Sequence, residues 1–363
     1  MNKVTVFDAE PIPDVEELFT QLSSSVFFTR IDLSKGYMQI LVNPVDRHKT
    51  FATHLGLFQW IRMPFGLVAA PAVFARMMRC LELQKMSSVN FFDDILTHSC
   101  SFADHLVHVR GVLEKLRQFN LTARPSKILT GYKSLSFLGH VVGRGLIQPE
   151  QKKVQKILAI PTPTTRKQVR SLLRLLSFYR RYVPNFAALT APISDLTKEG
   201  RGRAISWTPE CERALNAVKS IFSSSPVLQL ARLSKPYVLQ TDASSTGVGA
   251  VLLQDLGGTL HPVCFSSRKL LDRETRYSTI ERECLAIVWA VMKFSKFLWG
   301  VEFTLQTDHR PLVYLNTSRF KNSRIMRWAL SLQEYRFKVE PLPGTQNVLA
   351  DMLSREQCDQ EIP

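Results

Sequence analysis

The sequence lacks any uninterrupted apolar run of about 18 residues, the length that a membrane-spanning helix needs. It also lacks the charged start and apolar stretch of a signal peptide, so we expect no membrane role. No internal repeat and no low-complexity tract is present, which excludes solenoids and repetitive fibrous proteins.

Cysteine is also scarce, and its spacing argues against a disulfide framework and against a cysteine-based zinc site. No Cys-x-x-Cys pair occurs among the six cysteines, which are Cys80, Cys100, Cys211, Cys264, Cys284 and Cys358. We therefore expect reduced thiols and an intracellular protein, in either the cytoplasm or the nucleus. His105 and His108 have no third ligand nearby, so we interpret them as one solvated face of a helix and not as zinc ligands.

Acidic residues are outnumbered by basic ones. The 47 Lys and Arg residues against 31 Asp and Glu residues give a formal net charge of +16. This balance favours a polyanionic partner, although a basic soluble enzyme would show it too. The chain has 363 residues, of which 45% are hydrophobic, so we expect two or three domains with real cores.

The acids that do occur include an adjacent pair, Asp93 and Asp94, between apolar and aromatic residues. These flanks predict a β-hairpin with the two carboxylates at its turn. A second short strand ends at Asp32. Two like charges beside apolar surface are costly unless a cation relieves them, and carboxylates suit Mg²⁺. An ordinary exposed turn is the alternative for the Asp-Asp pair.

Several motifs in this order resemble the reverse transcriptase and ribonuclease H portion of a Pol polyprotein from a gypsy-type LTR retrotransposon. They lie at residues 31–40 (Ile-Asp-Leu-Ser-Lys-Gly-Tyr-Met-Gln-Ile), 63–67 (Met-Pro-Phe-Gly-Leu), 70–74 (Ala-Pro-Ala-Val-Phe), 91–94 (Phe-Phe-Asp-Asp) and 137–140 (Phe-Leu-Gly-His). The resemblance runs nearly end to end. It departs from the family at Phe91, Val68, Ala69 and Arg174.

The resemblance implies a multidomain α/β and α+β fold. A reverse transcriptase palm would cover residues 1–145, with the family's β-rich fingers largely missing. Thumb and connection would follow over 146–230, and a ribonuclease H-like mixed sheet with flanking helices over 231–357. Because the fingers carry basic residues that hold the triphosphate, we expect weak or absent primer extension.

The resemblance also implies the polymerase site. Asp32, Asp93 and Asp94 would be the catalytic, metal-binding acids. Tyr37, Phe65 and Gly66 would contact the nucleotide, with a buried core tyrosine as the alternative for Tyr37. Phe137, Leu138 and Gly139 would grip the primer.

A basic helix is predicted after Pro163. Thr165 is a candidate N-cap, and Arg166, Arg170, Arg174 and Arg181 recur at intervals that place them in one stripe. Such a stripe is able to follow a phosphate backbone, but it is also compatible with an ordinary solvated face.

The ribonuclease H-like unit would use four acids around two metal ions. The family's motifs align with Asp242, Glu283, Asp308 and Asp351. Glu281 is the alternative on the helix, but Ser278 to Glu281 has capping-box spacing, which gives Glu281 a structural role. We therefore favour Glu283.

The resemblance implies a multifunctional enzyme, an RNA-directed DNA polymerase and a ribonuclease that cleaves RNA in RNA/DNA hybrids. Mg²⁺, or Mn²⁺, would be the cofactor of this two-metal phosphoryl transfer. The partners would be RNA/DNA hybrid, template-primer and dNTPs, with the oligomeric state open. Two alternatives remain: a catalytically impaired nucleic-acid-binding remnant, and ribonuclease H activity alone.

Overall fold

The chain divides into two compact units in a computed structural model, residues 1–147 and residues 148–363. The structure describes residues 2, 10–47, 50–198, 205–233, 235–307 and 323–341. Among these residues, no helix has both the length and the apolar character to cross a bilayer. The division of the chain into palm, thumb and ribonuclease H-like parts stays a prediction.

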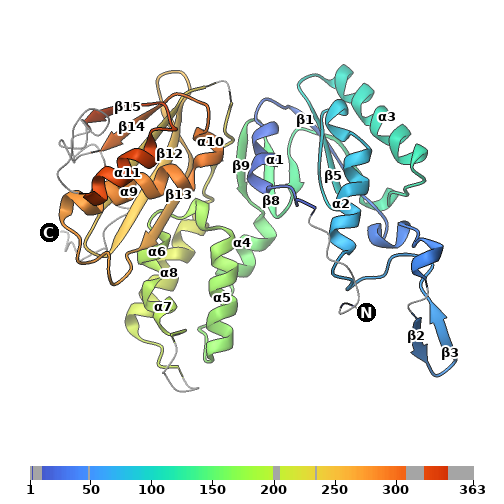
Figure 1. Cartoon of the computed structure of the whole chain (residues 1–363), viewed down its shortest axis with the longest axis horizontal. Coiled ribbons are helices and arrows are strands. Elements are labelled where there is room, and N and C mark those ends of the chain that lie inside the picture. Colours follow the sequence, from blue (N-terminus) through green and yellow to red (C-terminus); the bar gives the residue numbers. More distant parts are fainter. Residues whose placement is uncertain are drawn as a thin grey trace. The chain divides into compact units, whose positions relative to one another are not determined.

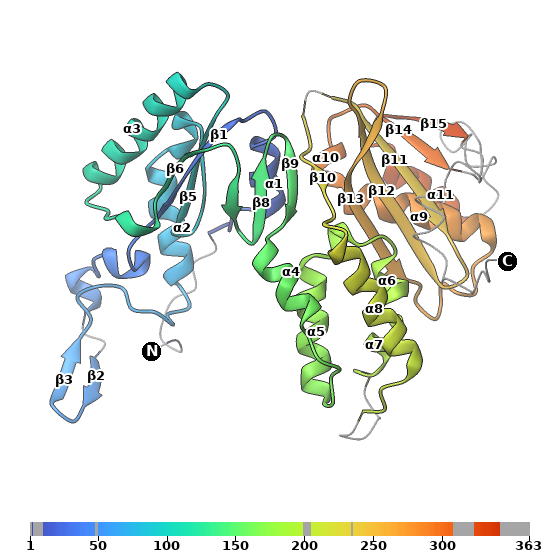
Figure 2. The same ribbon diagram turned by 180° about the vertical axis from the view of Figure 1, so that it is seen from behind.

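The first unit is an antiparallel sheet with helices packed on it (Figures 1 and 2). Strand order is β4-β5-β1-β6. Ile31 and Ile95 from the sheet share a core with Phe74 of α2 and with Val112 and Leu116 of α3. The elements are α1 (Val15–Gln21), β1 (Phe27–Asp32), β2 (Thr50–Thr53), β3 (Gly56–Gln59), α2 (Ala70–Cys80), β4 (Ser88–Phe91), β5 (Asp94–Ser99), α3 (Phe102–Gln118), β6 (Leu129–Tyr132), β7 (Leu135–Phe137), β8 (His140–Gly143) and β9 (Leu146–Pro149).

Strands β2 and β3 form a separate hairpin that extends away from this sheet (Figure 1). The Phe51 ring stacks on Phe58 at 5.8 Å and on Trp60 at 4.7 Å. These cross-strand ring pairs stabilise a ribbon that has little other packing.

The second unit contains a five-stranded mixed sheet in the order β13-β12-β11-β14-β15. The pairs β13/β12 and β12/β11 are antiparallel, whereas β11/β14 and β14/β15 are parallel. Helices α9 and α11 contact each other, and α9 packs against β11 and β12. The elements are α4 (Gln151–Leu158), α5 (Arg166–Phe178), α6 (Phe186–Leu189), α7 (Ala191–Asp195), α8 (Pro209–Ser223), β10 (Leu228–Gln229), β11 (Tyr237–Ala243), β12 (Gly247–Asp255), β13 (Leu260–Lys269), α9 (Thr279–Lys293), α10 (Ser295–Leu298), β14 (Phe303–Thr307), α11 (Ser323–Leu332) and β15 (Phe337–Pro341).

The prediction that His105 and His108 form a solvated face of α3 is wrong for His105. His105 is buried, with its Nε2 2.7 Å from the Thr29 hydroxyl and its Nδ1 3.1 Å from the Ser99 hydroxyl. The same Ser99 hydroxyl is 2.8 Å from His108 Nδ1. Strands β1 and β5 therefore supply the polar partners, Thr29 and Ser99, that make burial of His105 possible.

His98 completes this cluster of imidazoles, and it makes the stability of the first unit dependent on pH. Its Nδ1 lies 2.8 Å from the Ser25 hydroxyl. Burial, followed by the neighbouring His108 and His105, lowers the pKa of His98 from 6.5 to about 4. Because the unfolded chain binds this proton more readily, the free energy of unfolding should fall as pH drops from 6.5 towards 4. The loss from His98 should reach up to about 3 kcal/mol.

Chemical denaturation at a series of pH values measures this dependence. In the matched variant His98→Asn, the amide oxygen remains able to accept a hydrogen bond from Ser25 but does not titrate. Its stability should change less between pH 6.5 and 4. An identical slope in both proteins would show that His98 is not responsible.

Candidate active sites

Strand pairing in the first unit brings the three predicted polymerase acids together. Asp32, the last residue of β1, lies opposite Asp94, the first residue of β5. Asp93 occupies the two-residue turn between β4 and β5, and its carbonyl accepts a 3.0 Å hydrogen bond from Leu33 N. Phe92, the other turn residue, has a φ of 50°, a strained value for a bulky side chain. The turn therefore presents Asp93 on the exposed tip of the hairpin beside Asp32.

Two basic residues hold two of these acids. The guanidinium of Arg30 donates to both oxygens of Asp94, with Nη2 at 2.9 Å from each. Lys127 Nζ lies 3.1 Å from Asp32 Oδ2. Partial burial raises the pKa of Asp94, Arg30 opposes this rise, and the nearby charges of Asp93 and Asp32 add to it. No motif in the sequence points to Arg30 or Lys127, although Arg30 stands two residues before Asp32 and so lies on the same strand face.

The donors in this cluster suit a hard cation. Among the residues that the structure describes, no three His, Cys, Asp or Glu side chains are gathered so as to hold a metal as they stand. Arg30 engages both oxygens of Asp94 from a sheltered side chain, whereas Lys127 engages both oxygens of Asp32 from a side chain that is 51% exposed. Because the exposed Lys127 is the more easily displaced partner, the acids best placed to accept a metal are Asp32 and Asp93. Two carboxylates are also the number that Mg²⁺ usually takes when substrate phosphates complete its shell. The residues present therefore fit the predicted cofactor.

Of the predicted nucleotide-binding residues, Tyr37 lies close enough to Asp93 to sense its charge. Tyr37 packs edge-on against Phe65 and Phe74, at centroid distances of 5.5 and 5.2 Å. Burial raises the pKa of Tyr37, and the charge of Asp93 adds to this shift. Tyr37 is only partly buried, whereas 60% of Phe65 is exposed. Gly66 has a φ of +88°, a conformation that few other residues adopt.

Gly36 lets Asp93 and the ring of Phe74 approach the backbone closely. A Cβ at Gly36 would lie 3.0 Å from Phe74 Cζ and 3.1 Å from Asp93 Cβ. Phe74 is fully buried, so we expect the turn that carries Asp93 to shift by a few tenths of an ångström. We expect Gly36→Ala to slow primer extension on the order of tenfold to a hundredfold, since small displacements of reacting groups have large effects.

Gly111→Ala is the matched control. There, the new Cβ would meet the flexible side chain of Met86 at 3.1 Å, and alanine favours the helix. This variant should extend primers as the wild type does. Equal extension by Gly36→Ala would show that Asp93 tolerates the added methyl group.

The prediction that Phe137, in the hairpin of β7 and β8, contacts the primer is wrong. Its side chain is fully buried and packs edge-on against Phe19 at 6.4 Å, so it is not available to contact a primer. Leu138 and Gly139 form the turn, with φ values of 49° and 79°. Both are partly exposed and remain predicted contacts.

The basic helix is shorter than the sequence pattern indicates. Thr165 caps α5, as the sequence predicts, and Gln168 completes a capping box with it, but the helix ends at Phe178. Arg181 therefore does not belong to the stripe, and its guanidinium donates to the Val263 carbonyl at 3.4 Å. Arg170 and Arg174 are exposed and Arg166 is partly buried, so their contact with nucleic acid stays a prediction.

Two of the four predicted ribonuclease H acids lie in the described residues, and both are buried. Asp242 near the end of β11 is 3% exposed, and Glu283 in α9 is 5% exposed. The two elements pack against each other. Asp308 and Asp351 lie outside the described residues. Strand β14 ends at Thr307, one residue before Asp308, and pairs in parallel with β11.

Glu281 has the structural role that its spacing predicts. Ser278 N donates to Glu281 Oε2 at 2.9 Å, which completes the capping box of α9. Arg324 of α11 donates to Glu281 Oε1 at 2.7 Å. Both oxygens are thus engaged, whereas Glu283 shares the sheet-facing side of α9 with Ile287 and Ala290.

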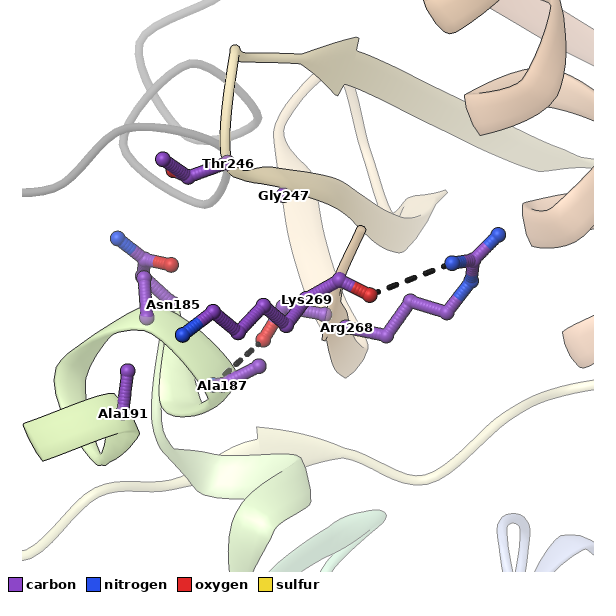
Figure 3. A pocket seen from close by; sticks show the side chains of 9 residues that line it. Asn185, Ala187, Ala191, Thr246, Gly247, Arg268 and Lys269 are labelled. Carbon is purple, nitrogen blue, oxygen red and sulfur yellow. Dashed lines mark hydrogen bonds between the residues drawn. The ribbon is translucent and has the colours of Figure 1, made fainter. Parts of the chain in front are cut away.

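A small cavity in the second unit is not a substrate site. It lies between α6, α7 and the ends of β12 and β13, with Asn185 and Lys269 among its lining (Figure 3). Its volume is about 10 Å³, which is room for one water molecule. A bond of 3.0 Å from Ala187 N to the Ser267 hydroxyl closes one side.

Two protein families match the chain, one over the part with the predicted polymerase acids and one over the part with the predicted ribonuclease H acids. The family described as "Reverse transcriptase (RNA-dependent DNA polymerase)" matches residues 1–142. The "RNase H-like domain found in reverse transcriptase" matches residues 232–335. Asp32, Asp93 and Asp94 fall in the first range, and Asp242 and Glu283 in the second.

Curated relatives match almost the whole chain. It is 37% identical to the Pol polyprotein of transposon 297 of Drosophila melanogaster, covering 99% of this chain and 34% of that protein. With the transposon gypsy polyprotein of the same organism, identity is 34%, over 99% of this chain and 36% of that protein. The chain thus spans about a third of the length of these relatives.

Solved structures share the fold. A foamy viral protease-reverse transcriptase in complex with double-stranded DNA has a TM-score of 0.85 at 21% identity, covering 94% of this chain and 73% of that one. The same kind of protein in complex with an RNA/DNA hybrid has a TM-score of 0.82 at 20% identity, over 100% of this chain and 50% of that one. The matched families and the aligned relatives together show that this chain belongs to the reverse transcriptase and ribonuclease H family of gypsy-type LTR retrotransposon Pol proteins.

Proposed function

We propose that the chain carries out two phosphoryl transfers on nucleic acid: template-directed DNA synthesis in its first unit and cleavage of the RNA strand of RNA/DNA hybrids in its second. The observation that carries this proposal is the convergence of Asp32, Asp93 and Asp94 at the end of one strand pair. The buried Asp242 and Glu283 support the second activity. The net charge of +16 suits the polyanionic substrate.

In synthesis, the primer's 3′ oxygen would bond to the α-phosphorus of a dNTP while pyrophosphate leaves. Asp32 and Asp93 would hold Mg²⁺, or Mn²⁺. Tyr37 and Phe65 would form the wall of the nucleotide site next to Asp93. Bound metal supplies the positive charge that stabilises the attacking and leaving oxygens. Arg30 and Lys127 offset part of the acids' charge.

In cleavage, a water oxygen would bond to phosphorus as one phosphodiester bond of the RNA strand breaks. Asp242 and Glu283 would hold the metal from the end of β11 and from α9. Burial of these acids excludes bulk water from one side of the site and strengthens their interaction with a cation.

Two assays with the purified chain test this proposal. A labelled RNA/DNA hybrid should be cut, and a primer should be extended on its template, although weakly, each only when Mg²⁺ or Mn²⁺ is present. Removal of the metal with EDTA should stop both, and readdition should restore them. Tight binding of hybrid without turnover in either assay would favour a binding protein that has lost catalysis.

A further inference from the structure

Arg30 forms several hydrogen bonds next to the polymerase acids, and none of the catalytic roles described above requires them. Its Nε donates to Asp94 Oδ1 at 3.1 Å, and its Nη2 donates to both Asp94 oxygens at 2.9 Å. The remaining nitrogen, Nη1, donates to the Ser136 carbonyl at 3.3 Å. One guanidinium thus joins the hairpin that carries Asp93 to strand β7, which leads into the turn at Leu138 and Gly139.

The geometry of these bonds is specific to arginine. A planar fork matches both oxygens of a carboxylate and still leaves a donor for a third acceptor. Lysine has one nitrogen on a flexible stem and cannot span the same three acceptors at once. The pair is also sheltered, since the side chains of Arg30 and Asp94 are 28% and 20% exposed. By contrast, the Lys127 side chain is 51% exposed, and its single Nζ is 3.1 and 3.4 Å from the two oxygens of Asp32.

Asp94 needs such a partner because it faces Asp32 across the strand pair. Without the fork, its carboxylate would be free to rotate towards Asp32 and Asp93 and to change the arrangement of the acids that accept the metal. Strand β7 would also lose its side-chain link to the sheet strand that ends at Asp32.

We propose that Arg30 is a positioning residue for DNA synthesis, which fixes the Asp94 carboxylate and couples the acid hairpin to the hairpin of β7 and β8. This inference rests on the proposed polymerase function. Arg30 acts through its bonds to the Asp94 carboxylate and the Ser136 carbonyl. It holds Asp32 and Asp93 at a constant position relative to the turn that would bear on the primer end.

Steady-state primer extension separates positioning from general stability. Arg30→Lys and Arg30→Met should each lower kcat at least about tenfold while KM for the dNTP changes less than about twofold, because the acids move but the nucleotide contacts remain. The double variant Arg30→Met with Asp94→Ala should be no slower than the slower single variant, since each change removes the same contact. Arg117→Met on the exposed surface of α3 is the matched control and should match the wild type.

Two results would overturn the proposal: wild-type kcat in Arg30→Lys, or additive losses in the double variant. A loss that only follows a lower melting temperature, with hybrid cleavage falling in parallel, would mean that Arg30 merely stabilises the fold. If the wild type extends no primer, the polymerase function fails instead. Hydrogen exchange then decides about Arg30: Arg30→Met should speed exchange of the β7 and β8 amides severalfold, and unchanged exchange there would refute the coupling.

Discussion

Glu283→Gln is expected to lower the rate of hybrid cleavage on the order of a thousandfold, a loss typical of removing one group from a catalytic set. Glu283 is 5% exposed and lies on the side of α9 that faces the sheet. A glutamine of the same size retains the packing but removes the charge that would hold a metal. Single-turnover cleavage of a labelled hybrid at saturating enzyme measures the effect, and circular dichroism checks the fold.

Glu281→Gln is the matched control, because it makes the same chemical change two residues earlier on the same helix. Its carboxylate is already used by Ser278 and Arg324, so its loss should weaken the start of α9 by about 1 kcal/mol without slowing cleavage comparably. Asp242→Asn should behave as Glu283→Gln does. A larger loss in Glu281→Gln than in Glu283→Gln would reverse the assignment of the catalytic glutamate.

The sequence alone predicts the elements that carry the acids, because local patterns determine them. Apolar and aromatic flanks predict the hairpin of β4 and β5, a second short strand is predicted to end at Asp32 as β1 does, and the capping-box spacing from Ser278 to Glu281 marks the observed start of α9. Each of these features depends on residues close together in the chain, so tertiary contacts alter them little.

The sequence does not predict contacts between residues far apart in the chain. In α3 the apolar Leu106 is 55% exposed, whereas the polar His105 is buried because Thr29 and Ser99 provide its partners. Likewise, the arginine spacing continues to Arg181, but the chain leaves the helix after Phe178. The link from Arg30 to Asp94 and Ser136 spans 64 and 106 residues, and no periodicity contains it.

Asp93→Asn is expected to lower primer extension on the order of a thousandfold while leaving hybrid cleavage unchanged. Asp93 is exposed at its turn, lies next to Gly36 and raises the pKa of Tyr37, so its charge acts where the nucleotide would bind. Asparagine fits the same turn but binds Mg²⁺ far less well, because it is neutral. Extension of a labelled primer and cleavage of a labelled hybrid, measured on one protein preparation, test the two units separately.

Asp94→Asn gives the sharpest comparison, because it changes the neighbouring residue in the same way. Its remaining oxygen can still accept from Arg30, as Oδ1 now accepts from both Nε and Nη2. We therefore expect a loss at least about tenfold smaller than in Asp93→Asn, since the charge removed already has a cationic partner. If Asp94→Asn were instead the more severe change, Arg30 would have to release its carboxylate during synthesis, and Asp32 and Asp94 would be the pair that accepts the metal.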